Sequence, residues 1–85
     1  MKLHEMPNIG KQLAAKLEKV GINDSEEFIT IGSKEAFVRI KTELDDGCIN
    51  MLYTLEGAVQ GIRWHSLSKD QKNELKIFYD SLEAK

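Results

Sequence analysis

The chain has 85 residues and a net charge of −2, and 31% of its residues are charged with both signs interspersed. This length suffices for one domain and excludes two, while the mixed composition is typical of a globular rather than a disordered chain. A free-standing DNA-binding domain usually carries a clear basic excess, so any contact with nucleic acid has to come from local charge. We therefore expect a single domain over residues 1–85.

Five helices and no strands are expected from the apolar spacing and the capping signals. The first spans residues 8–20, with Asn8 as its N-cap and Gly21 as its C-terminal stop. The second spans residues 25–31, where Asp24 opens a sequence resembling a capping box. Both present an apolar stripe at helical spacing, which predicts that they pack on a common core.

The third helix is expected over residues 34–44, capped by Ser33, and the fourth over residues 48–60. The fourth is the most apolar, which predicts a central position with packing on several sides. Gly57 in its interior costs about 1 kcal/mol relative to alanine. We expect close approach of another helix to offset that cost; the alternative is that Gly57 belongs to a surface that binds a partner. The fifth helix is expected over residues 69–82.

The segment from residue 6 to residue 22 resembles the turn and second helix of a helix-hairpin-helix motif. Apolar and small residues fit the motif in register at Ile9, Gly10, Ala14, Leu17 and Gly21, whereas Asn8 replaces the first motif glycine. Only five residues precede this segment, so the first helix of the motif has almost no room. For the whole chain we predict a compact all-α bundle of five short helices, similar to helix-hairpin-helix or SAM-like domains.

This turn is the candidate DNA contact. Glycine lets a phosphate approach the backbone, and a helix N-terminus presents free N–H groups at the positive end of its dipole. We predict contact with the DNA backbone through Asn8, Ile9, Gly10 and Lys11, in a segment whose residues 1–22 hold four lysines against two acids. The alternative is that the turn only shapes the entry into the first helix.

A second candidate surface combines aromatic and basic side chains. Arg63, Trp64 and His65 are consecutive, and an exposed tryptophan there would stack on a base or bind a protein partner. The alternative places Trp64 in the core beside the last helix, with its two neighbours in solvent. Ile49 and Tyr53 lie on one flank of the fourth helix, which is a candidate protein interface or, equally, a surface packed on the first helix.

The sequence offers little for catalysis or metal binding. It has no phosphate-binding loop of the P-loop type and no nucleophile–base pair, and His4 and His65 lie far apart. Cys48 is the only cysteine, so no intrachain disulfide is possible. We interpret Cys48 as a small buried residue and expect no catalytic residues, no metal and no cofactor.

The compartment follows from the same features. A fold without a disulfide needs no oxidising environment. No apolar run approaches the roughly 20 residues of a membrane span, and the N-terminus lacks the apolar region of a signal peptide. We expect a cytoplasmic protein with no membrane contact.

Three segments carry a more specific resemblance. Residues 46–58 read Asp-Gly-Cys-Ile-Asn-Met-Leu-Tyr-Thr-Leu-Glu-Gly-Ala, residues 61–65 read Gly-Ile-Arg-Trp-His, and residues 34–37 read Lys-Glu-Ala-Phe. In order and spacing they are similar to the C-terminal domain of the TfoX (Sxy) family of DNA transformation regulators, and the match runs from Met6 to Phe78. Many family members carry a further N-terminal domain.

The resemblance implies a bacterial regulator of genes for natural transformation, which acts with the cyclic-AMP receptor protein and offers no catalytic residues. Two functions stay open. One is a transcription-regulatory module that touches the DNA backbone at the glycine turn, which the basic first helix favours. The other is a protein-interaction or dimerisation module without direct DNA binding, which the acidic net charge favours.

Overall fold

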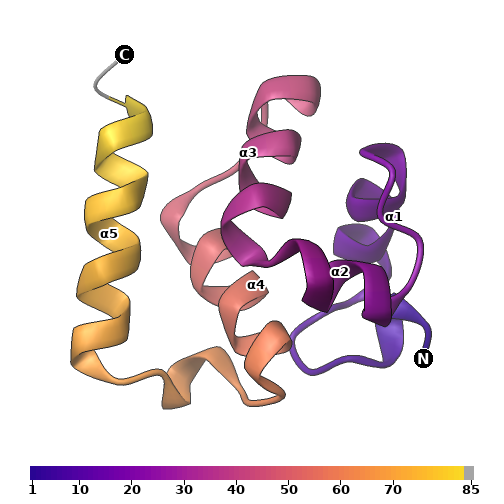
Figure 1. The fold of residues 1–85 in the computed structure, drawn as a ribbon, viewed down its shortest axis with the longest axis horizontal. Coiled ribbons are helices and arrows are strands. Elements are labelled where there is room, and N and C mark those ends of the chain that lie inside the picture. The colour runs from indigo at the N-terminus through magenta and orange to yellow at the C-terminus, as the bar shows by residue number, and fades with distance from the viewer. Residues whose placement is uncertain (84–85) are drawn as a thin grey trace.

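The computed structural model describes residues 1–83, which fold into five α-helices and two short 3₁₀-helices, with no strand among them (Figure 1). This confirms the predicted all-α bundle. The elements are η1 Leu3–Glu5, α1 Lys11–Lys19, α2 Ser25–Ile31, α3 Ser33–Leu44, α4 Ile49–Gln60, η2 Trp64–Ser66 and α5 Lys69–Glu83.

Helix α4 occupies the centre of the bundle, as its apolar sequence predicted. It packs against α3, η2 and α5, and the side chains of Leu52 and Leu55 are fully buried. In Figure 1, α5 stands along one side of α4, while α1 and α2 lie at the opposite side of the molecule. No helix within residues 1–83 has the length and apolar character that crossing a membrane requires.

Local caps explain where two of the helices begin. The side chain of Asp24 accepts a hydrogen bond from the N–H of Glu27 at 2.9 Å, as the sequence predicted for α2. At α5, Ser68 and Gln71 cap each other: the Ser68 N–H donates to Oε1 of Gln71 at 3.0 Å, and the Gln71 N–H donates to Oγ of Ser68 at 3.1 Å. Each cap satisfies N–H groups that the first turn of a helix leaves without partners.

Three expectations about helix starts and burial were wrong. Helix α1 begins at Lys11 with Gly10 as its N-cap, not at Asn8, which lies in the preceding turn with a φ of 69°. Helix α3 includes Ser33, and Gly32 is its N-cap. Cys48 is exposed rather than buried, because as the N-cap of α4 it precedes the face of the helix that enters the core.

A 3₁₀-helix that the sequence analysis did not predict precedes the turn. Leu3 in η1 and Met6 just after it are buried in the core, and the Ser25 N–H at the start of α2 donates to the Met1 carbonyl at 3.1 Å. Three residues of η1 therefore stand where a helix-hairpin-helix motif has its first α-helix. The likeness of the fold to that motif stays a prediction.

Gly57 is buried against two close neighbours, the turn before α1 and the segment that leads from α4 into η2, rather than against another α-helix. A Cβ atom at Gly57 would lie 2.6 Å from Nδ2 of Asn8, 2.9 Å from the carbonyl oxygen of Ile62 and 3.0 Å from Cα of Trp64. The turn before α1 and the connection after α4 thus both press on α4 at this glycine.

Candidate functional site

The turn over residues 7–10, here called the entry turn, leads into α1. The Ile9 N–H donates to the carbonyl of Met6 at 3.2 Å, and the Ala14 N–H donates to the carbonyl of Gly10 at 3.0 Å. Gly10 is the N-cap of α1 and supplies no side-chain cap. The first turn of α1 therefore has N–H groups without a side-chain cap. They lie at the positive end of the helix dipole, where a negatively charged ligand is stabilised.

Gly10 is exposed, and nothing inside the domain requires a glycine at this position. Its backbone has a φ of −86° and a ψ of 179°, which any residue adopts, and a Cβ atom there would meet nothing within 4 Å. The missing side chain leaves the N-terminus of α1 uncovered. Lys11, the first residue of the helix, is exposed beside it.

Asn8 holds the entry turn against the end of α4. Its Nδ2 donates to the carbonyl of Ile62 at 2.9 Å and to that of Thr54 at 3.4 Å, while its Oδ1 accepts from the N–H of Trp64 at 3.3 Å. We call these three bonds the Asn8 bridge. Asparagine tolerates the left-handed backbone conformation that this position adopts. The bridge fixes the entry turn and η2 relative to each other.

The four residues predicted to contact DNA therefore divide into two pairs. Gly10 and Lys11 are exposed at the start of α1. The side chain of Ile9 is buried in the core and that of Asn8 is engaged in the Asn8 bridge, so these two residues position the turn and offer only their backbone to a ligand.

The structure also brings together three of the five residues predicted to bind a partner. The ring of Trp64 stacks on His65 with centroids 4.0 Å apart and on Tyr53 with centroids 6.2 Å apart and planes 14° from parallel. We call Tyr53, Trp64 and His65 the aromatic platform. Arg63 is exposed next to it, whereas Ile49, one turn before Tyr53 on α4, packs against the core.

Trp64 is neither fully exposed nor fully in the core, the two alternatives that the sequence left open. It is half-buried and packs against the core, and the ammonium of Lys72 on α5 lies 5.6 Å from the centre of its ring. His65 remains exposed, although its ring stacks on Trp64. The platform is thus anchored to the bundle and reaches the surface at its edge.

Beside the platform runs a groove that the sequence analysis did not identify. It has a volume of about 400 Å³. Its lining residues come from α4 and α5 and are Tyr53, Lys69, Asp70, Lys72, Asn73 and Lys76. The lysines at positions 69, 72 and 76 have a spacing that places them on one face of α5. This spacing was the feature of the sequence that could have indicated the groove.

A second, smaller hollow of about 130 Å³ lies where α3, α4 and α5 meet. Its polar groups bond mainly to one another: Glu56 accepts from the hydroxyl of Ser33 and from Nε2 of Gln60, the latter at 2.6 Å. This network ties α3 to α4. Within residues 1–83, no group of three or more His, Cys, Asp or Glu side chains is arranged to hold a metal ion.

Comparison with known proteins gives a consistent result. A family model described as the TfoX C-terminal domain matches residues 1–79. The chain is 32% identical over 84 residues to "Protein Sxy" of Escherichia coli (strain K12), covering 99% of this chain and 40% of that protein. It is 28% identical over 75 residues to "DNA transformation protein TfoX1" of Aliivibrio fischeri (strain ATCC 700601 / ES114), covering 87% of this chain and 36% of that protein. The chain thus spans well under half the length of these curated relatives.

Two crystal forms from Listeria monocytogenes share the fold. A triclinic form of an uncharacterized protein superposes with a TM-score of 0.94 at 53% identity, covering 98% of this chain and 94% of that one. A tetragonal form of a protein of unknown function superposes with a TM-score of 0.90 at 54% identity, covering 94% of this chain and 99% of that one.

Proposed function

Because the chain belongs to the TfoX C-terminal domain family, we propose that it is a non-catalytic module that supports the regulation of DNA transformation genes by contacting the DNA backbone through the entry turn. The family and the name of the Aliivibrio fischeri relative, a DNA transformation protein, support the biological role. The uncovered N-terminus of α1 supports the physical contact.

The single observation that carries the contact is Gly10. Glycine is a favoured N-cap residue, and at this position its missing side chain also leaves the N–H groups of the first turn open to what approaches from outside. A phosphate accepts hydrogen bonds from N–H groups of the first turn when no side chain stands in the way, and Lys11 adds a positive charge beside it. Contacts of this kind carry no sequence information and weaken steeply with salt.

We expect Gly10→Val and Lys11→Glu each to weaken binding to duplex DNA without unfolding the domain. Valine covers the N–H groups, and glutamate reverses the charge. Lys11→Glu places a negative charge at the helix N-terminus, which stabilises a helix by about 0.3–1 kcal/mol, so lost binding is not explained by lost folding. The measurement is fluorescence anisotropy of labelled duplex DNA at two salt concentrations, with circular dichroism as the check on folding.

Matched controls lie on the same helix. Ala15→Val adds bulk at an exposed position of α1, and Lys19→Glu makes the same charge change at its other end. Both should leave DNA binding close to that of the unaltered chain. Equal losses in the controls, or no duplex binding by the unaltered chain at low salt, would reject the DNA contact and favour a module that binds a protein regulator or a second copy of itself.

A further inference from the structure

We propose that the groove between the aromatic platform and α5 binds a single-stranded nucleic acid, with bases stacking beside Tyr53 and phosphates contacting Lys69 and Lys72. This site is distinct from the entry turn, because it is lined by residues of α4 and α5 and by none of α1. It adds a second class of nucleic acid to the backbone contact proposed above.

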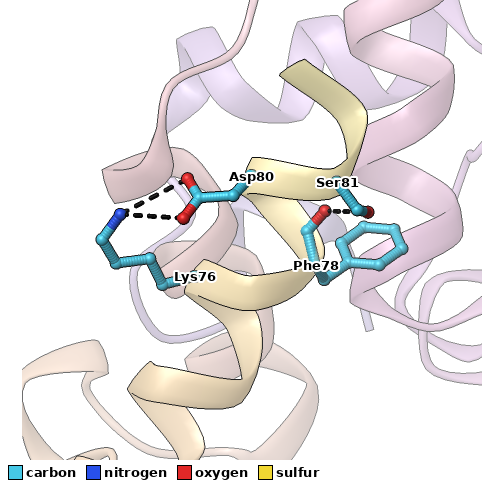
Figure 2. Close-up of polar contacts among 4 residues, drawn as sticks. All are labelled: Lys76, Phe78, Asp80 and Ser81. Atoms are coloured by element: carbon cyan, nitrogen blue, oxygen red, sulfur yellow. Dashed lines mark hydrogen bonds and ion pairs between the residues drawn. The ribbon is translucent and has the colours of Figure 1, made fainter. Parts of the chain in front are cut away.

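The charge of the groove matches a phosphate chain. Three lysines and one acid, Asp70, line it. Lys76 is held by Asp80 one turn on, with Nζ 3.1 and 3.3 Å from the two carboxylate oxygens (Figure 2). In the described part of the chain, Lys69 and Lys72 pair with no carboxylate. Their charges are therefore available to an anion that enters the groove, although the chain as a whole is acidic.

The aromatic rings decide which anion fits. Tyr53 lines the groove and stacks on Trp64, and Lys72 extends over the Trp64 ring. Alternating rings and cations are the features with which proteins bind single strands, since bases stack on aromatic side chains while lysines track the phosphates. The groove of about 400 Å³ is open to solvent over much of its surface, so a base has access to it.

Other anions match only part of this surface. An acidic peptide would neutralise Lys69 and Lys72 but would leave the ring of Tyr53, the one aromatic side chain in the lining, without a flat partner. Duplex DNA has its base faces stacked inside the helix, so it would offer only phosphates. A single strand presents both chemistries together, which favours it as the occupant.

The test uses Trp64, the only tryptophan of the chain, as its reporter. The whole chain is titrated with a short oligothymidylate and, separately, with polyglutamate, while tryptophan fluorescence is followed at several salt concentrations. We expect the oligothymidylate to quench Trp64. Tyr53→Leu, which keeps the apolar bulk but removes the flat ring, should weaken binding about tenfold. In Lys69→Gln/Lys72→Gln, the slope of log K against log salt should become shallower by about 1.4, because each phosphate contact on a single strand contributes about 0.7.

The control pair is Lys19→Gln/Lys34→Gln, which removes the same charge outside the groove. The match includes the setting of one lysine. The ammonium of Lys34 lies 5.3 Å from the centre of the Phe78 ring, much as that of Lys72 lies 5.6 Å from the centre of the Trp64 ring. Its salt slope should stay that of the unaltered chain. Any of four results would overturn the proposal: no quenching at low salt, an equal change of slope in the control pair, tighter binding of polyglutamate than of the oligothymidylate, or abolition of quenching by Lys11→Glu, which would place the strand at the entry turn.

Discussion

At the scale of single residues, Asn8 and Gly57 form a complementary pair separated by almost fifty positions. The backbone of Asn8 has a left-handed conformation, and its side-chain amide donates to the carbonyl of Ile62 just after α4. Gly57 lacks the Cβ atom that would occupy the space of that amide. The cost of a glycine inside α4 is offset by the hydrogen bonds of the Asn8 bridge, which need the chain segments to approach this closely.

Gly57→Ala tests this pairing directly. In an ordinary helix interior the change stabilises by about 1 kcal/mol. Here the new methyl group would lie 2.9 Å from the carbonyl oxygen of Ile62 and 3.0 Å from Cα of Trp64. Both are backbone atoms, which cannot rotate away, so we expect a net loss of about 1–2 kcal/mol in the free energy of unfolding. Urea denaturation measures it, and an increase in stability would show that the packing at this glycine is looser than described.

At the scale of elements, the local sequence predicted most of the helices and few of their long-range constraints. The bounds of α2 were predicted to the residue, and those of α3, α4 and α5 to within one residue. Caps and glycine stops are local signals, which explains this success. The start of α1 was wrong by three residues, since bonds from Asn8 to distant backbone groups fix it. The 3₁₀-helix η1 was missed because it is stabilised by the burial of Leu3.

An ion pair joins α1 to the connection between α3 and α4. Nζ of Lys16 lies 2.5 Å from Oδ2 of Asp46, which follows α3. The hydrogen bond from Lys16, reinforced by the N–H of Gly47 at 2.8 Å, lowers the pKa of Asp46 below its usual 3.8. Both side chains are partly exposed, so the pair makes a small contribution to stability that salt screens.

The sign of the pH dependence follows from that shift. The folded chain favours ionised Asp46, so the stabilisation is present above about pH 3.8 and is lost as the pH falls through the lower folded pKa. Asp46→Asn should slightly lower the melting temperature at neutral pH and have a smaller effect near about pH 2, below the ordinary pKa of the carboxyl, because protonation of Asp46 removes the charge that holds the pair. Melting curves by circular dichroism at the two pH values measure this, and Lys16→Gln should reproduce it. An equal drop at both pH values would assign the effect to packing.

At the scale of the whole molecule, the balance of acidic and basic residues varies along the chain. Residues 23–47 hold seven acids against three bases, while lysines gather on α1 and on one face of α5. The entry turn was visible in the sequence because its residues are adjacent. The groove was not, since Tyr53, Trp64 and Lys72 meet only through the packing of α4, η2 and α5. Net charge alone therefore understates the basic surfaces of this domain.

Stability is expected to be uneven across the bundle. Helix α4 packs on three elements and buries Leu52 and Leu55 completely, whereas α5 leaves Ile77 62% exposed. The amides of α4 should exchange with solvent only through global unfolding, while those along the outer face of α5 should exchange through smaller openings. Native-state hydrogen exchange measured by NMR would show this order. Equal protection of α4 and α5 would instead indicate a single cooperative unit.

The Asn8 bridge has a consequence for how this domain varies. All three partners of the Asn8 side chain are backbone groups, the carbonyls of Thr54 and Ile62 and the N–H of Trp64. No substitution of those partners can therefore compensate for a change at Asn8, so this position should show no covariation with them in homologous sequences. In a genetic screen, Asn8 alleles should be pleiotropic and impair both the entry turn and the aromatic platform, with suppressors that restore general stability rather than a specific contact.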